Sequence, residues 1–233
     1  MHLIRGNFHM LLISLLVASC ATFEPSMQFR NIMIGRQPTV RDSQGGLEVS
    51  VEEFVSPEKS GQAFDADIAS YGVLALLLSV ENKGSENYHV HQSDVQALLG
   101  GRSLVFLSGV DAANRAATSE TIGKALAWTV ATGPFFILTW PFTVGGSTYH
   151  TQTVNRRIQQ HFEELRFTGA SLKPNQQAAG FVYFLLPEGA SQLENLTLSV
   201  RASEEQTGRR LSYNLVLPPL RLPSSKQIET QEK

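Results

Sequence analysis

Two histidines separated by a single residue are a natural place to look for chemistry in this sequence. His89 and His91 lie in a short segment that predicts a β-strand, on which residues two apart face the same side. With Asp94 nearby they could hold a metal ion, or they could be exposed imidazoles on a polar edge strand. His150 and His161 lie on a predicted helix, roughly 16 Å apart, too far to share an ion. We expect no metal and no cofactor.

Catalytic motifs are equally sparse. Ser56 and Lys59 have the S-x-x-K spacing of enzymes that react with penicillin, but the Ser-Asp pair before Val95 lacks the following Asn, and no Lys-Thr-Gly occurs. The proline and charged residues after Ser56 predict a loop, so we interpret this spacing as coincidence. The Gly-Lys pair at 123–124 lacks the other residues of a phosphate-binding loop, and the G-x-S-x-G, H-E-x-x-H and G-x-G-x-x-G motifs are absent. We expect a protein that is not an enzyme.

The single cysteine, Cys20, follows a segment typical of an export signal. Arg5 supplies a positive charge, and residues 8–17 form an apolar run that is too short to span a bilayer. The segment Val17–Cys20 reads Val-Ala-Ser-Cys, an aliphatic residue and two small residues before the cysteine. It resembles the lipobox of bacterial lipoproteins. The alternatives are an ordinary signal peptide with an incidental cysteine, or a buried N-terminal helix.

The resemblance covers only the leader, and it implies where the protein resides. Residues 1–19 would be removed as a signal peptide, and Cys20 would carry a diacylglyceryl group and an acyl chain such as palmitate. Two or three acyl chains are enough for stable anchoring. Ala21, rather than Asp, follows the cysteine, which resembles sorting to the outer membrane. We therefore expect a lipid-anchored envelope protein, at the outer membrane and facing the periplasm.

The overall charge argues against one class of partner. Of the 233 residues, 42% are hydrophobic, as in a globular protein, and 17% are charged, a low share that leaves most of the chain to build a core. The formal net charge is −2. No cluster of Lys or Arg stands out against that balance. Nucleic-acid binding is therefore not expected.

Short strands separated by turns dominate the rest of the chain. Residues 47–52 alternate strictly between apolar and polar, and residues 71–80 are nearly all apolar, as in a strand covered on both faces. Further strands are predicted at 88–91, 95–99, 103–107, 180–186, 196–200 and 211–217, with a Gly-Gly hairpin turn at 100–101. This pattern predicts a mainly β fold, an immunoglobulin-like antiparallel β-sandwich.

The expected domain boundaries follow from these elements. Residues 20–46 form the lipidated N-terminus and a tether with at most one short strand, and residues 47–217 form the sandwich. Residues 218–233, which begin with prolines and continue as a polar segment, are expected to be a disordered tail. A helical insertion is expected at about 109–166, with Asp111 or Ser119 as the possible N-cap of its first helix. Its second helix, at 147–167, has apolar residues at three- and four-residue steps.

The insertion contains an unusual apolar segment, residues 125–146. No charged residue occurs between Lys124 and Arg156, so the stretch is long enough to be a membrane candidate. Its large apolar side chains, which could contact a membrane or a partner, include Trp128, Phe135, Phe136, Trp140 and Phe142. The segment could pack on the sandwich, as its prolines favour, dip into the bilayer, or bind a partner or apolar ligand.

Two functional hypotheses follow. In the first, a non-enzymatic envelope lipoprotein presents its apolar helical insertion to another envelope component. In the second, the protein is a carrier or chaperone for a hydrophobic ligand such as a lipid, held between the insertion and the sheet.

Overall fold

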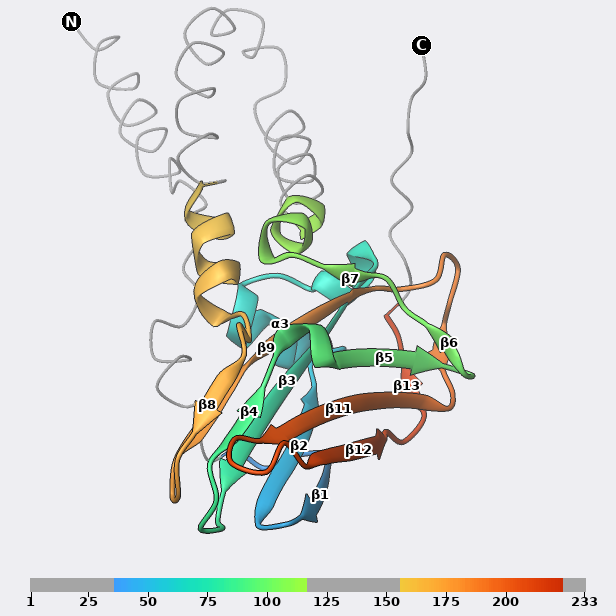
Figure 1. The fold of residues 1–233 in the computed structure, drawn as a ribbon. Helices are drawn as coiled ribbons and strands as arrows, with labels where there is room; N and C mark the ends of the chain where they lie inside the picture. The colour runs from blue at the N-terminus through green and yellow to red at the C-terminus, as the bar shows by residue number, and fades with distance from the viewer. Residues whose placement is uncertain (1–35, 117–155, 224–233) are drawn as a thin grey trace, which may run out of the picture.

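The computed structural model describes residues 36–116 and 156–223, and within them most strands form two antiparallel sheets (Figure 1). Apolar side chains from both sheets form one hydrophobic core between them. Helices pack on the outer face of one sheet, and their side chains share a second core with it. The protein is thus mainly β, a sandwich with a helical insertion, as the sequence predicts.

The five-stranded sheet runs in the order β1 (Val40–Gln44), β2 (Leu47–Glu53), β3 (Val73–Asn82), β9 (Gln177–Leu185) and β7 (Phe106–Leu107). The six-stranded sheet runs in the order β6 (Arg102–Ser103), β5 (Val95–Leu99), β11 (Leu196–Glu204), β4 (Tyr88–Val90) and β8 (Ala170–Leu172), and β12 (Arg210–Val216) pairs with β11. A further small pair joins β10 (Gln192–Leu193) to β13 (Leu220–Arg221).

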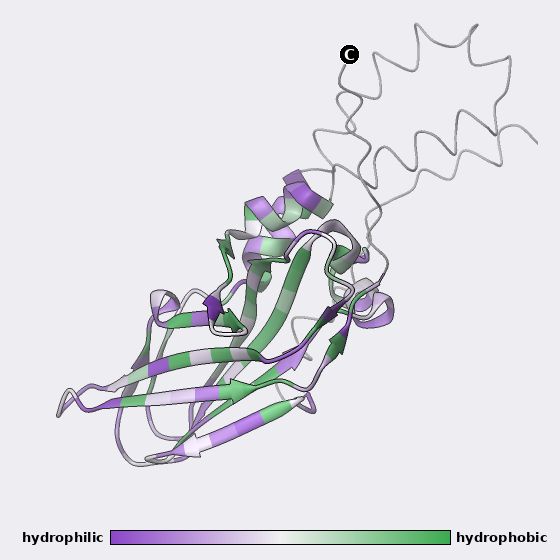
Figure 2. Cartoon of the chain, turned by 90° about the vertical axis from the view of Figure 1, so that its right-hand side faces the viewer, coloured by the Kyte–Doolittle hydropathy of each residue, from purple (hydrophilic) through white to green (hydrophobic). Residues whose placement is uncertain are grey.

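Strand β3 is buried on both faces, as its apolar sequence predicts. Leu74, Leu76 and Leu78 face the core between the sheets. Ala75 and Leu77 point the opposite way, into the core beneath the helices. Strand β9 is likewise buried on both faces, from Gly180 to Phe184. In β11 and β12 buried residues alternate with more exposed ones, because only one face of these strands is covered (Figure 2).

The helical layer is built from four short elements. They are α3 (Pro57–Phe64), the 3₁₀ turn η1 (Ile68–Tyr71) and helical segments at 109–116 and 156–165. Phe162 and Leu165 of the last segment are buried against the sheet, which confirms the predicted apolar face of the second helix. The first segment begins at Ser108, whose hydroxyl accepts a hydrogen bond from Asp111 N while Asp111 Oδ2 accepts one from Ser108 N. Asp111 is therefore the partner in a capping box rather than the N-cap, and Ser119 lies outside the described residues.

The predicted strand at 103–107 is divided between the two sheets. Leu104 N donates to Ala97 O of β5, and Val105 O accepts from Leu185 N of β9. The chain therefore crosses from the six-stranded sheet to the five-stranded sheet between these two residues. The Gly100–Gly101 turn before it has positive φ angles at both residues, 55° and 81°, as predicted for a tight hairpin.

The sandwich extends beyond residues 47–217 at both ends. Strand β1 lies in the segment predicted as a tether, and Gly45 and Gly46 make the hairpin turn to β2 with φ angles of 60° and 85°. The one short strand that the prediction allowed in this segment is therefore β1, and it belongs to the sandwich. Leu220 and Arg221, predicted to lie in the tail, pair with β10, because the prolines before them end β12 without preventing a new short strand.

We expect Gly180→Ala to destabilise the attachment of the helical layer. A Cβ at this position would lie 2.7 Å from both the Cα and the N of Phe167. Phe167 lies where the chain passes from the second helix back to the sheet. Overpacking of this kind lowers the free energy of unfolding by about 1–3 kcal/mol. Urea denaturation of the full chain measures the difference.

Gly61→Ala is the matched control, since Gly61 lies in helix α3 and a Cβ there would meet no atom within 4 Å. Removing a helical glycine should stabilise the protein by roughly 0.5–1 kcal/mol. Equal effects of the two substitutions would contradict the close contact at Gly180.

Candidate functional site

An open cavity lies where the edges of the two sheets part, on the side where the chain crosses between them. We call it the seam pocket; its volume is about 500 Å³. Its lining comes from β5, β6, β7 and β9, from the crossing segment, from the 3₁₀ turn η2 (Gln92–Asp94) and from the end of the second helix: Gln92, Ser93, Val95, Gln96, Ser103, Leu104, Phe106, Arg166 and Phe184.

The floor of the seam pocket is apolar and belongs to the core. Val95 and Phe184 are almost fully buried, at 4% and 1% exposure. Phe106 lies edge-to-face on Phe184, with the ring centroids 5.7 Å apart, and is itself 38% exposed. An apolar group entering the pocket would therefore contact aromatic faces that belong to the core.

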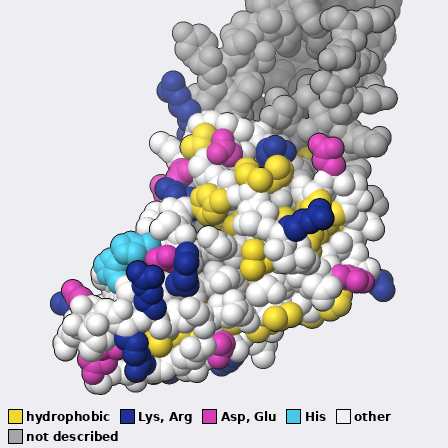
Figure 3. Space-filling model, turned by 45° about the vertical axis from the view of Figure 1, so that its right-hand side comes forward, with side chains coloured by type: hydrophobic (Ala, Val, Ile, Leu, Met, Phe, Trp, Pro, Cys, Tyr) yellow, Lys and Arg dark blue, Asp and Glu magenta, His cyan; other side chains and the backbone are white. Residues whose placement is uncertain are grey.

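The rim of the pocket continues as an exposed apolar surface. The large hydrophobic side chains that the described residues expose are Val105, Phe106, Val110 and Val216, and three of these four lie in the segment 105–110. Val105 is 61% exposed. Hydrophobic side chains gather on the upper part of the face shown in Figure 3. Grouped exposure of this kind is typical of an interaction surface.

A polar bridge closes one side of the pocket. The Arg166 guanidinium donates to Glu163 Oε2 at 2.7 Å and to Gln92 Oε1 at 2.8 Å. It thus joins the end of the second helix to η2. The Arg166 charge is balanced by Glu163, so the pocket offers an apolar floor with a polar edge rather than a group poised for catalysis.

The two ends of the helical insertion are held together beside this surface. Val110 N donates to Glu163 Oε1 at 3.1 Å, and Gln159 Nε2 donates to Asn114 Oδ1 at 2.8 Å. Tyr183 fixes the second helix to the sheet by donating its hydroxyl proton to Phe162 O at 3.2 Å. Burial raises the pKa of the Tyr183 hydroxyl well above its ordinary value, so it stays neutral and serves as a structural donor.

The S-x-x-K spacing has a structural role. A helix does begin here, contrary to the predicted loop: Ser56 is the N-cap of α3 and Pro57 its first residue, a position that proline suits. The Lys59 ammonium lies 2.8 Å from the Glu53 carboxylate and 3.4 Å from that of Glu52. Both residues of the spacing therefore have structural partners: Ser56 caps the helix, and Lys59 pairs with two carboxylates.

The predicted histidine pair does share a face. The rings of His89 and His91 have centroids 4.7 Å apart, but the Asp94 carboxylate, 3.5 Å away from the Arg201 guanidinium, pairs with that cation. Among residues 36–116 and 156–223, no three His, Cys, Asp or Glu side chains come together as metal ligands could. His161 bonds through Nε2 to Ala63 O at 2.7 Å, which makes it a packing residue of the helical layer.

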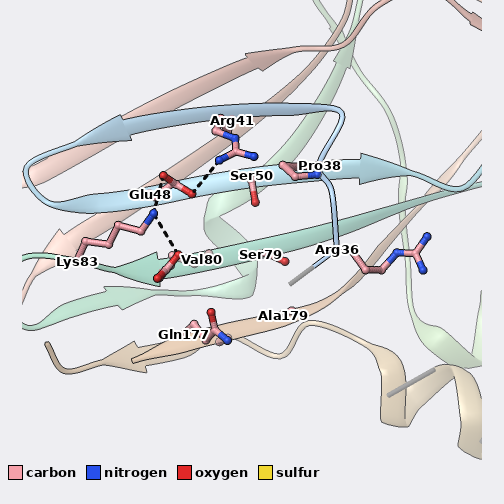
Figure 4. Close-up of a pocket in the computed structure, with 12 residues that line it drawn as sticks. Arg36, Pro38, Arg41, Glu48, Ser50, Ser79, Val80, Lys83, Gln177 and Ala179 are labelled. Carbon is pink, nitrogen blue, oxygen red and sulfur yellow. Dashed lines mark hydrogen bonds and ion pairs between the residues drawn. The ribbon is translucent and has the colours of Figure 1, made fainter. Parts of the chain in front are cut away.

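A second groove lies on the outer face of the five-stranded sheet, beyond the helices (Figure 4). Its volume is about 210 Å³. Lys83 Nζ lies 3.0 Å from Glu48 and 3.4 Å from Glu81, and the hydrogen bond to Glu48 raises the pKa of the Lys83 ammonium. Arg41 lies 3.9 Å from Glu48. These charges neutralise one another, so the groove has less to offer a ligand than the seam pocket has.

The predicted contact and lipidation residues lie outside the described residues. They are Cys20, Trp128, Phe135, Phe136, Trp140 and Phe142. No helix within residues 36–116 and 156–223 is long and apolar enough to cross a membrane. Sequence reasoning did not single out Leu104–Phe106 as a surface. The available signal was the run of four consecutive apolar residues at 104–107 within the predicted strand.

Comparison with known proteins adds similarity of shape only. No protein-family model and no curated protein matches the chain in sequence. The chain is similar to the solved structure of the yjhA protein from Bacillus subtilis, with 8% identity and a TM-score of 0.38 over 76% of this chain and 96% of that one. It is also similar to the lipoprotein candidate ycdA from Bacillus subtilis subsp. subtilis str. 168, with 11% identity and a TM-score of 0.35 over 78% of this chain and 39% of that one. No activity or partner follows from likeness at this level.

Proposed function

We propose that this chain is a lipid-anchored lipoprotein of the bacterial cell envelope that acts without enzymatic chemistry, by presenting an apolar surface to another envelope protein. The observation that carries the proposal is the seam pocket with its exposed rim at Val105 and Phe106. A monomer gains nothing from leaving these side chains in water. Covering them with a partner is worth about 25 cal/mol for each Å² of apolar surface removed from water.

The position of this surface supports the proposal. The helical segment 109–116 follows the rim directly along the chain, and the segment 156–165 ends at Arg166 on the pocket's edge. The apolar residues 125–146 lie between these two segments in the sequence. A partner bound at the rim would therefore also contact the two helical segments that flank the insertion.

The membrane anchor rests on the leader sequence. The lipobox-like Val17–Cys20 gives the thiol a purpose that the rest of the chain does not supply, since Cys20 is the sole cysteine. With Ala21 in the next position, the proposed location is the outer membrane, with the sandwich in the periplasm.

A second candidate function is transport or protection of a hydrophobic ligand such as a lipid. The volume of the seam pocket, about 500 Å³, lies within the range of small-molecule sites, roughly 300–1,000 Å³. Glutamine and serine side chains line part of it, however, and a wholly apolar acyl chain would leave them without water. Protein contact, with a polar rim around an apolar centre, suits this lining better.

We expect the anchor alone to hold the protein on the membrane. Replacing residues 1–20 by a signal peptide that is cleaved without lipidation should release the exported chain into the soluble periplasmic fraction and abolish palmitate labelling. Fractionation beside the native chain measures this. A non-lipidated chain that stays on membranes after an alkaline wash would instead assign residues 125–146 to the bilayer.

We expect a photo-cross-linking amino acid at Val105 to capture a protein neighbour in living cells. Val216 is the matched control, because it is the same residue type with the same 61% exposure but lies on β12 of the other sheet. A specific cross-linked band from position 105 and none from position 216 is the expected result. Equal labelling at both positions would contradict a dedicated surface at the rim.

The non-lipidated chain also distinguishes the two candidate functions, because it carries no acyl chains of its own. It is purified without detergent, and bound lipid is extracted and quantified. One lipid molecule for each protein molecule would establish the carrier function. A lipid-free chain that cross-links from position 105 to a protein supports the docking function.

A further inference from the structure

A group of cationic side chains lies on the outer face of the six-stranded sheet, away from the seam pocket. In the strand register, His89 of β4 is opposite Ser203 of β11, and Ser203 is opposite Arg210 of β12. Directly opposite residues on neighbouring strands share a face, with Cβ atoms about 5 Å apart. One row across three strands therefore carries an imidazole, a hydroxyl and a guanidinium.

A second row lies beside the first. Arg201 of β11 is opposite Ser212 of β12, and His91 lies two residues beyond His89, its ring 4.7 Å from the His89 ring. His91, Arg201, Ser203 and Arg210 line a cavity of about 270 Å³ together with Asp94 and Ala202. We call it the cationic pocket. Figure 3 shows histidine side chains beside basic side chains on this part of the surface.

The cationic pocket is positively charged, whereas the protein as a whole is slightly negative. The formal net charge of the protein is −2, yet two guanidiniums and an imidazole line the pocket against the single carboxylate of Asp94. Asp94 lies 3.5 Å from Arg201 and so balances one guanidinium. The neighbouring acidic residue Glu204 is buried and pairs with Arg209 at 3.7 Å. Arg210 has no ion pair within 4.0 Å among the described residues.

These side chains suit an anion and not a metal cation. His89 Nδ1 already shares a hydrogen bond with Ser171 Oγ, and the Asp94 carboxylate pairs with Arg201. Two guanidiniums within the same pocket oppose the entry of a divalent cation. They favour a tetrahedral oxyanion, which a planar guanidinium binds through two parallel hydrogen bonds, with hydroxyl and imidazole N–H groups as further donors.

We propose that the cationic pocket binds a phosphate group, with Arg201 and Arg210 as its main ligands and Ser203 and His91 as additional donors. The small volume of the pocket suits a phosphate rather than a large ligand. The phosphate could be inorganic or belong to a lipid headgroup at the membrane to which the chain is anchored. The site shares no residue with the seam pocket, so it stands whether or not the proposed docking function is correct.

The test is the reactivity of individual arginines toward phenylglyoxal, measured by mass spectrometry on the full lipidated chain in a non-ionic detergent. Saturating inorganic phosphate, compared with chloride at equal ionic strength, should slow modification of Arg201 and Arg210 about tenfold, as expected for a ligand at ten times its Kd. Arg102, exposed at the edge of the same sheet, is the internal control and should react at the same rate in both salts.

A second arm distinguishes the source of the phosphate. Micelles containing phosphatidic acid are compared with micelles containing an uncharged diacylglycerol. Protection by phosphatidic acid but not by inorganic phosphate assigns the site to a lipid headgroup, and the reverse result assigns it to a soluble phosphate. Protection of neither arginine by either probe, or equal protection by chloride, overturns the proposal.

Substitutions test whether phosphate protects Arg210 through the shared pocket. Arg201→Gln should abolish the protection of Arg210, since one guanidinium alone holds the anion weakly, whereas the matched Arg102→Gln should leave it unchanged. Arg201 is half-exposed, so the sheet should tolerate its replacement, and an unchanged far-ultraviolet circular dichroism spectrum and urea midpoint establish that it does. Full protection of Arg210 in Arg201→Gln would contradict the shared site.

Discussion

Strand β3 separates the two hydrophobic cores, and its residues from Val73 to Leu78 are buried without interruption. Leu74, Leu76 and Leu78 require the second sheet as a cover, whereas Ala75 and Leu77 require the helices. A one-residue shift in its pairing would exchange the two sets of side chains, so the register with β2 and β9 is strongly defined. The helical layer is therefore part of the folded domain and not an appendage.

The same strand defines where the helical layer ends. Ser79 and Glu81 replace the outward-facing apolar residues at its far end, and there the outer face carries the charged groove instead of helices. The helices are consequently confined to one end of the sheet. The chain reaches the helical segment 109–116 by crossing between the sheets at Leu104 and Val105, and beside this crossing the rim of the seam pocket is exposed.

The sequence predicted those parts of the fold that depend on local pattern. The uninterrupted apolar run at β3, the strands at β11 and β12 and the inward face of the second helix are all confirmed, because burial on one or two faces produces a periodic pattern of apolar residues. The division of residues 103–107 between two sheets was not predictable in this way. It depends on which strands lie opposite Ala97 and Leu185, and this is a matter of long-range pairing.

The candidate site shows the same limit. An exposed Phe106 and a buried Leu107 look alike in sequence, and only the position of β7 at a sheet edge separates them. Arg201 and Arg210 are isolated basic residues along the chain and become neighbours through the β11–β12 register. His89 and His91 were recognisable as a pair from their spacing, but the guanidiniums that change their chemistry were not.

The turn η2 connects the two surfaces of the protein. Gln92 lines the seam pocket and accepts a hydrogen bond from Arg166, whereas Asp94, two residues later, lies in the cationic pocket beside Arg201. A three-residue 3₁₀ turn has little freedom to move one of these side chains without the other, because its backbone is fixed by the bond from Asp94 N to His91 O. Substitutions in η2 would therefore disturb both pockets together. Val105, in the crossing segment beside β9, and Arg201, on β11, are positions at which each surface can be altered separately.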